Sequence, residues 1–414
     1  MSIDAEQLTD TIVATKRLLR EGLPRRAEVF AEVAEHIRVE VAEIRAAAAQ
    51  GRSVIPQLEH AGVTAGSVSP DEKDEIRRRG VVIVRHVFTR EQAGAWDEEL
   101  GEYLTANGYG DAAVDRELDQ YFETPTPIRP QIAGIYWSRP QVLARQSVNL
   151  AETRAFLNGL WNRGRGDAVV FDPTEECTYA DRIRRRAPGD TSLGLPPHMD
   201  AGSVERWIDP GYREVYRHVY SGDWTAFDPF DAAHRTEVRE VRSPALCSMF
   251  RTFQGWTALT RQGPGDGTLQ VVPATLGVVY LLLRALQDDV ADDDLCGARL
   301  TRALRADPQW HAELLEGLVS IPEVQPGDTV WWHPDVLHAV EGVHTGRGYS
   351  NVLYIAAAPA CGKNRAYLER QRPTFLAGES PPDFGPEHHE VGYRGRGTLA
   401  DLTPLGRRQM GFEP

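Results

Sequence analysis

Two residues with metal-binding side chains stand two positions apart near the middle of the chain: His198 and Asp200. In an extended strand, side chains at these positions point to the same side. One imidazole and one carboxylate on that side supply two ligands of a 2-His-1-carboxylate facial triad, which holds Fe(II) and leaves open positions for substrate and oxygen. The third ligand must come from elsewhere, and His338 is the best candidate. Arg347 follows nine residues later, where a 2-oxoacid cosubstrate would need a cation.

A His-x-Asp triplet is weak evidence by itself, because about one is expected by chance in a chain of this composition. A second triplet is in fact present, formed by His333 and Asp335. If it were the metal-binding pair, the third ligand would be one of three later histidines: His344, His388 or His389. The first of these is too close in sequence to span strands easily, and the others lie in a polar, Pro-rich tail. We therefore favour the first triplet, and the remaining alternative is a chain that binds no metal.

Three arginines precede the first triplet at alternate positions, Arg182, Arg184 and Arg186. If residues 177–186 form a regular strand, these side chains share one face. If these arginines point inward, they need anionic partners. If they point outward, they form a solvated face. Arg184 is the one that we expect to line an active site.

The composition excludes several classes of partner. The chain has 414 residues, of which 41% are hydrophobic, and a net charge of −14. This is enough apolar material for a sizeable core, and the negative charge disfavours nucleic acid and anionic membranes. The four cysteines are far apart in sequence and are typical of reduced thiols. With no recognisable signal peptide or membrane-spanning segment, we expect a cytoplasmic protein that acts on a small molecule; its oligomeric state stays open.

The hydrophobic pattern predicts three regions. Residues 1–70 form a helical extension, in which apolar residues recur at three- or four-residue steps. Residues 71–358 form the core, where many short strands separated by Gly and Pro turns indicate a sandwich or barrel. Near its start, residues 74–80 are expected to end a helix on a glycine cap, and residues 81–84 to form a buried strand. Residues 359–414 are polar and turn-rich and are expected to wrap the surface. The fold class is therefore mainly β with helices (α+β), and no dinucleotide-binding, P-loop or nucleophile-elbow motif is present.

Residues 201–245 form an insertion that is long for a connection inside a compact domain. The segment is rich in aromatic side chains and arginine, which suit a binding lid and suit a packed satellite helix equally well. Because it leaves the His198 strand directly, we expect its first turns to lie near the metal. Arg206 and Trp207 are the side chains expected to reach over the mouth of the pocket.

Several stretches resemble known families in the same order along the chain. Residues 80–88, the His198 triplet, residues 267–273, Gly327-Asp328 and the pair His338 and Arg347 resemble the phytanoyl-CoA-dioxygenase-like enzymes. Residues 250–260 and 331–335 look more closely like the YbiU-type family, a bacterial and fungal group of unknown function. The resemblance covers most of the chain. It implies a double-stranded β-helix (jelly-roll) core and an Fe(II)- and 2-oxoglutarate-dependent oxygenase.

The resemblance also implies roles for individual residues. His198, Asp200 and His338 would hold Fe(II), and Arg347 would pair with the far carboxylate of 2-oxoglutarate. Tyr349 falls on the same face as Arg347 and could add a hydroxyl group. With O2, the enzyme would oxidise a C–H bond of a small molecule that is polar, anionic or an amino acid, releasing succinate and CO2. A carboxylate ligand favours hydroxylation, desaturation or cyclisation over halogenation.

Two alternatives belong to other classes. One is a cupin-type metalloenzyme, such as an isomerase or a Zn(II) hydrolase. The other is a jelly-roll protein that binds a ligand without catalysis. A cation beside the metal separates the oxygenase from the cupin-type enzyme, since only a user of a 2-oxoacid needs one there.

Overall fold

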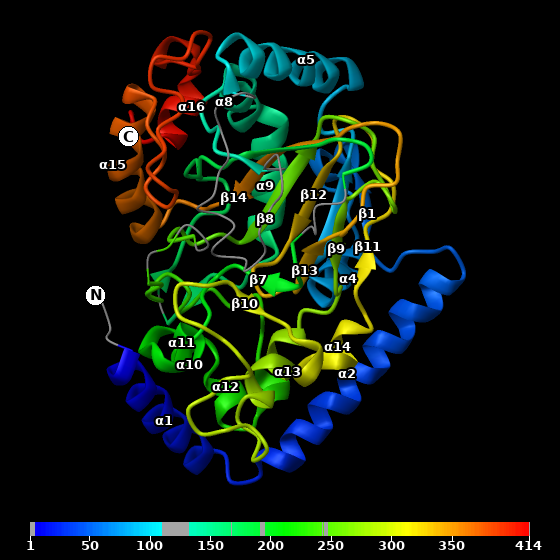
Figure 1. Ribbon diagram of the computed structural model, residues 1–414, viewed down its shortest axis with the longest axis vertical. Helices are drawn as coiled ribbons and strands as arrows, with labels where there is room; N and C mark the ends of the chain where they lie inside the picture. The colour runs from blue at the N-terminus through cyan, green and yellow to red at the C-terminus, as the bar shows by residue number, and fades with distance from the viewer. Residues whose placement is uncertain are drawn as a thin grey trace.

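The computed structural model describes residues 5–109, 132–166, 168–190, 195–241, 243 and 247–413. Two sheets lie at the centre of the molecule, and helices gather at both ends (Figure 1). The last positions of the expected insertion, 242, 244 and 245, lie outside the described residues. None of the described helices combines the length and the apolar character needed to cross a membrane.

The larger sheet has seven strands in the order β1-β2-β12-β8-β14-β6-β3. Neighbouring strands are antiparallel, except for the parallel pair β1 and β2. Its strands are β1 Gln57–Glu59, β2 Val81–Arg85, β3 Ile132–Ala133, β6 Ile183–Arg186, β8 Phe253–Ala258, β12 Thr329–Trp332 and β14 Ser350–Ala357.

The smaller sheet has five antiparallel strands in the order β10-β7-β13-β9-β11. Its strands are β7 His198–Met199, β9 Leu269–Val271, β10 Leu304–Arg305, β11 Val319–Ser320 and β13 His338–Val340. A separate hairpin pairs β4 Gly164–Arg165 with β5 Ala168–Val169.

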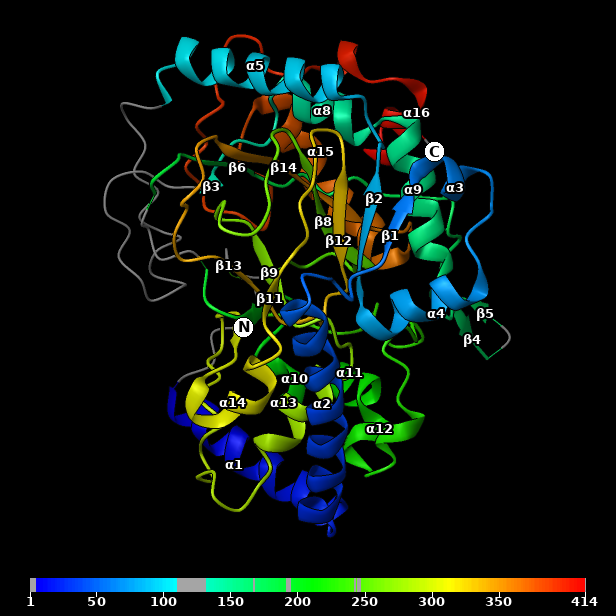
Figure 2. The same ribbon diagram turned by 90° about the vertical axis from the view of Figure 1, so that its right-hand side faces the viewer.

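The larger sheet is buried on both faces, as its continuous apolar runs predict. On the inner face, Trp256 and Val352 pack with Val271 of the smaller sheet in one apolar cluster. On the outer face, Trp331 and Leu353 pack with the helices α5 and α9 in another cluster, and these helices lie over that face in Figure 2. The helices of this half are α3 His60–Thr64, α4 Pro70–Arg79, α5 Arg90–Ala106, α8 Arg139–Arg145 and α9 Val148–Gly159.

The turn from α4 into β2 requires a glycine. Ser69 begins α4 with a capping box, and Gly80 ends it with φ at 65°, a conformation that a side chain disfavours. A Cβ atom at this position would lie 2.4 Å from Thr275 Cγ2 and 2.6 Å from Val336 Cγ2. The sequence-based expectation of a helix that ends on a glycine cap is confirmed here.

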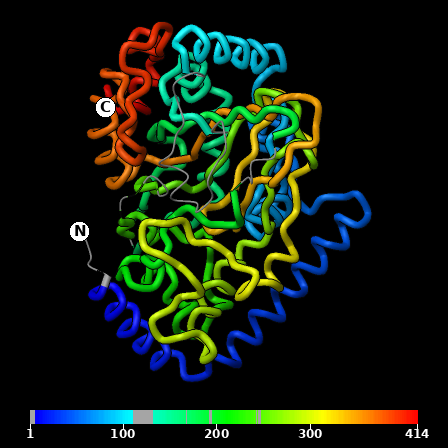
Figure 3. Tube along the Cα trace, viewed as in Figure 1, coloured from blue at the N-terminus to red at the C-terminus, as the bar shows by residue number. Residues whose placement is uncertain are grey.

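The first two helices pack against the insertion rather than standing apart. They share one apolar cluster with helices from residues 204–220 and 277–315, and Figure 3 shows the blue N-terminal trace along that end of the molecule. The elements of this helical end are α1 Ala5–Gly22, α2 Arg26–Ala49, α10 Glu205–Ile208, α11 Pro210–Val215, α12 Arg217–Tyr220, η1 Trp224–Ala226, α13 Gly277–Arg284 and α14 Pro308–Leu315.

The C-terminal region contains more regular structure than the sequence analysis expected. Its elements are α15 Gly362–Ala377, η2 Leu399–Asp401 and α16 Pro404–Gln409. Helix α15 was missed because it is polar and contains Pro373, which lacks a backbone N–H and normally interrupts a helix. Buried Tyr367, Leu368 and Phe375 hold it against the rest of the chain in one apolar cluster.

A buried ion-pair network joins the helical end to the sheets. Asp335, in the turn between β12 and β13, accepts hydrogen bonds from Arg206 on α10 and from Arg235, each at 2.7 Å. The hydroxyl of Tyr216 donates to the same carboxylate at 2.9 Å. The Asp335 side chain is fully buried, so the two arginines hold the pKa of this carboxyl well below its usual range although burial opposes that shift.

Replacing Asp335 with alanine should destabilise the protein by about 3–5 kcal/mol, because two buried guanidinium groups would lose their carboxylate. The matched control is Asp292→Ala, which removes the 73% exposed partner of Arg20 and should cost less than about 1 kcal/mol. Urea unfolding of both variants measures the difference. Equal losses would show that the Asp335 network contributes no more than a surface ion pair.

Candidate metal centre

The structure brings His198, Asp200 and His338 together at one end of the smaller sheet. His198 begins β7 and His338 begins β13, and the two residues are direct partners in the antiparallel pair. Asp200 follows β7 immediately; one carboxylate oxygen lies 3.2 Å from His198 Nε2, and the other lies 3.7 Å from His338 Nε2. One ligand atom from each residue lies within 4.8 Å of the other two, and the described residues contain no other such cluster of three.

Both imidazole rings are oriented by the backbone. His198 Nδ1 lies 2.6 Å from the carbonyl oxygen of Pro196, and His338 Nδ1 lies 3.1 Å from that of Val336. A hydrogen bond from Nδ1 to a carbonyl leaves the Nε2 lone pair available, which is the usual arrangement for a metal-binding histidine. The two Nε2 atoms therefore face Asp200 as acceptors that a cation can use.

The protonation states also suit a metal site. Burial, helped by the nearby His198, lowers the pKa of His338 to about 4, so this imidazole is neutral at pH 7. Burial alone would raise the pKa of Asp200, but His338 and His198 together hold it well below its usual range. The Nε2 group of Gln254 donates to Asp200 Oδ2 and fixes the carboxylate from the side.

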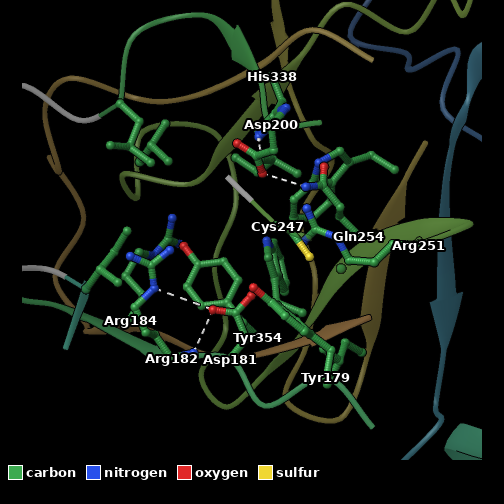
Figure 4. A pocket seen from close by; sticks show the side chains of 18 of the residues that line it. Tyr179, Asp181, Arg182, Arg184, Asp200, Cys247, Arg251, Gln254, His338 and Tyr354 are labelled. Carbon is green, nitrogen blue, oxygen red and sulfur yellow. Dashed lines mark hydrogen bonds and ion pairs between the residues drawn. The ribbon is translucent and has the colours of Figure 1, made fainter. Parts of the chain in front are cut away.

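The triad opens into a cavity between the two sheets. Its apolar lining includes Trp256, Leu269, Trp332 and Ile355, and its polar lining contains arginines from two segments. Figure 4 shows Asp200 and His338 on one side, Arg182 and Arg184 on a second, and Arg251 with Gln254 on a third. The cavity therefore combines a potential metal site with cationic groups.

Arg184 is a buried cation whose hydrogen bonds go to neutral groups. Its side chain is 1% exposed, and its Nη2 donates to Gln262 at 3.0 Å and to the hydroxyl of Ser350 at 3.2 Å. Its Nε has no hydrogen-bond partner, and burial lowers the pKa of the guanidinium. Arg182 beside it is paired with Asp181 at 3.4 Å, so Arg184 is the one left without a carboxylate.

The structure places the other two predicted cosubstrate residues differently. Arg347 and Tyr349 lie in the connection between β13 and β14, which ends only at Ser350. Both are exposed, with Tyr349 at 50%, and neither is in the lining of the cavity. Because the strand begins after these residues, their side chains are not directed between the sheets. Of the three residues that the sequence analysis expected to bind the cosubstrate, only Arg184 lines the cavity.

The second His-x-Asp triplet belongs to the core. His333 stacks on Trp161 with ring centroids 4.9 Å apart, and its Nε2 bonds the carbonyl of Pro229. Its Nδ1 accepts from the backbone N–H of Asp335, so neither nitrogen is free for a metal. The Asp335 carboxylate is paired with the two arginines described above. The contacts of this triplet are therefore structural contacts within the core.

The expectation that Arg206 and Trp207 reach over the pocket is wrong. Both are at most 1% exposed; Trp207 lies in the apolar cluster of the helical end, and Arg206 pairs with Asp335. Both lie on helix α10, which turns into that cluster directly after the triad. Among the described positions of 201–245, none lines the cavity.

The sequence analysis missed Arg182, Arg251, Gln254 and Tyr354 as lining residues. A signal existed for two of them, since Gln254 stands inside an otherwise apolar strand and Arg182 shares its periodicity with Arg184. Arg251 precedes β8 in a stretch without regular secondary structure, so no periodicity indicates where its side chain points.

Comparison with known proteins shows the family. Residues 6–412 match the Gig2-like family. The uncharacterised protein YbiU of Escherichia coli K12 is 44% identical over 400 residues, which cover 96% of this chain and 95% of the relative. The chain therefore belongs to the Gig2-like family, and its resemblance to YbiU-type proteins is confirmed.

Two solved structures share the whole fold. One is a protein of Salmonella typhimurium LT2 described as a candidate oxidoreductase, with a TM-score of 0.94 and 41% identity, covering 99% of this chain and 98% of that one. The other is Gig2, the product of GlcNAc-inducible gene 2 of Candida albicans, with a TM-score of 0.82 and 27% identity, covering 97% and 89%. The arrangement of helices and sheets is thus common to bacterial and fungal members.

Anaerobic protein should bind about one Fe(II) per chain, as a single facial triad requires. The single variants His198→Ala, Asp200→Ala and His338→Ala should each weaken binding by more than about a hundredfold, since losing even an outer partner of a metal ligand costs 10–100-fold. His218→Ala, a partly exposed histidine on α12, is the matched control and should bind normally. Metal content after dialysis measures the effect, and full occupancy in His338→Ala would refute the ligand assignment.

Proposed function

We propose that this protein is an Fe(II)- and 2-oxoglutarate-dependent oxygenase that oxidises, and in the simplest case hydroxylates, a C–H bond of a small molecule. One observation carries the proposal: a His-Asp-His triad and the buried Arg184, which has no carboxylate partner, line the same cavity. A metal site alone fits several classes of enzyme. A buried cation beside it fits a cosubstrate that chelates the metal at one end and carries a carboxylate at the other.

The strand order supports a double-stranded β-helix core for this enzyme. The strands from β6 to β14, without the edge strand β10, can be numbered 1 to 8 in chain order. Neighbouring strands in the larger sheet then have the order 1-8-3-6, and those in the smaller sheet have the order 2-7-4-5. Strands that follow each other in the chain thus lie mostly in opposite sheets, as in a jelly roll built from two Greek keys. His198 begins strand 2 of this count and His338 begins strand 7, and Asp200 follows strand 2 directly.

The donor set fits the proposed metal. Two imidazole nitrogens and one carboxylate on one side leave the positions facing the cavity free, as the 2-His-1-carboxylate site of non-haem iron oxygenases requires. Bound there with 2-oxoglutarate and O2, iron supplies the oxidising chemistry that inserts oxygen into a C–H bond and releases succinate and CO2. Gln254 holds Asp200, and the carbonyls of Pro196 and Val336 hold the histidines, so the chain presents preformed ligands.

In this proposal Arg184 takes the role that the sequence analysis gave to Arg347. Its planar guanidinium suits two parallel hydrogen bonds to a carboxylate. The Ser350 hydroxyl accepts from Arg184 at 3.2 Å and donates to Gln262 at 2.7 Å, and so helps to orient the guanidinium. Apolar side chains line the same cavity, including Trp256, Leu269 and Trp332. They exclude water, which strengthens an ion pair inside the cavity.

Arg184→Gln should weaken 2-oxoglutarate binding to the Fe(II) protein by about 1.5–3 kcal/mol, the scale of a hydrogen bond to a charged group. Arg347→Gln is the matched control, because this arginine is exposed outside the cavity, and it should bind normally. Anaerobic titration, followed by the visible absorption of the iron complex, measures both affinities.

Aerobic conversion of 2-oxoglutarate to succinate, screened with a panel of metabolites, tests the activity itself. A cupin-type isomerase or hydrolase would keep the metal and ignore 2-oxoglutarate. Metal binding without any affinity for 2-oxoglutarate would therefore reject the proposed function while leaving the metal centre in place.

A further inference from the structure

The charges of the described residues that line the cavity do not balance once the proposed ligands are placed in it. Among the described lining residues, three guanidinium groups stand against two carboxylates: Arg182, Arg184 and Arg251 against Asp181 and Asp200. One positive charge is therefore left over. A divalent metal adds two more, and the dianion 2-oxoglutarate removes two. One positive charge remains among mostly buried lining residues, where an unpaired charge is costly.

Arg251 is the group left with this charge. It is 7% exposed, and among the described residues its guanidinium makes no hydrogen bond or ion pair with a side chain, only longer-range charge interactions and a ring contact. Its guanidinium lies over the ring of Tyr179, 5.5 Å from the centroid. The Asp200 charge that helps to stabilise it is also the one that a metal would use. The nearby buried Asp383 is occupied by Ser248 and Tyr179.

We propose that Arg251, stacked on Tyr179, binds a carboxylate of the prime substrate and so sets the substrate class as a small molecule with one negative charge. The inference rests on the proposed function, since the charge balance includes both the metal and 2-oxoglutarate. A carboxylate fits better than a phosphate monoester, because it carries the single charge that is needed and matches the planar fork of arginine. A phosphate monoester carries close to two charges at pH 7.

The two buried arginines differ in position, which separates their roles. Arg184 belongs to β6 and bonds groups on or beside the larger sheet. Arg251 lies outside the strands and shares its wall of the cavity with Tyr179, Cys247 and Phe384, which also lie outside the sheets. In this proposal, residues on or beside the larger sheet bind 2-oxoglutarate, and residues outside the sheets bind the substrate.

Protein loaded with Mn(II) and saturated with 2-oxoglutarate provides the test, because Mn(II) at the triad relaxes the protons of a molecule bound nearby. Propionate, its neutral isostere propionamide and methyl phosphate serve as probes. Propionate should show saturable relaxation of its methyl protons, and propionamide should show none. Arg251→Gln should raise the Kd for propionate by about tenfold or more, which corresponds to the loss of one charged hydrogen-bonded contact. Arg347→Gln should leave it unchanged.

The affinity for 2-oxoglutarate separates the two proposals. Arg251→Gln should bind 2-oxoglutarate within about threefold of the wild type, whereas Arg184→Gln should not. Three results would each overturn the inference. These are equal binding of propionate and propionamide, tighter binding of methyl phosphate than of propionate, and loss of 2-oxoglutarate binding in Arg251→Gln. Wild-type protein that ignores 2-oxoglutarate would instead reject the proposed function. Arg251→Lys keeps the charge and should fall between wild type and Arg251→Gln, and it replaces the glutamine variant if that fails to fold.

Discussion

The candidate site depends on one register, in which His338 of β13 lies directly opposite His198 of β7. A slip of one residue would turn one imidazole to the other face of the sheet and separate the ligands. Strand β7 has only two residues and cannot fix this register alone. Its neighbours supply the constraint: β9 pairs with the other side of β13, and β10 pairs Arg305 with His198. The short strands of the smaller sheet therefore position the three candidate ligands together.

Most of the protein interior follows the usual preference for apolar groups, and the cavity departs from it. Three arginines line a space between two sheets that are otherwise joined by apolar side chains. Buried cations with few anionic partners lower the stability of a fold, and such departures from local rules are expected where a ligand binds. Asp335 shows the contrasting case, since both of its oxygens are paired within the chain and its network joins two parts of the fold.

The features that could be predicted from the sequence are those that hydrophobic periodicity and residue type determine. The run Val81–Val84 and the glycine cap at Gly80 indicated a buried strand after a helix, which the structure contains. The three residues of the candidate triad could be chosen because His198 and Asp200 stand two positions apart in the sequence. Arg251 and the exposure of Arg347 could not be predicted, because both residues lie outside regular elements, where the path of the backbone depends on tertiary packing. The insertion was misjudged for a related reason: aromatic and arginine side chains suit a lid and a packed helix equally.

The packing of α2 has a consequence for synthesis on the ribosome. Its buried residues, among them Val33 and Ile37, lie in a cluster with α13 and α14, and α13 begins roughly 230 residues after α2 ends. At about 5–20 residues per second, the nascent chain would carry this apolar surface uncovered for roughly 10–45 s. The N-terminal helices are therefore made first and docked late, so a chaperone that shields amphipathic segments would act on them during this interval.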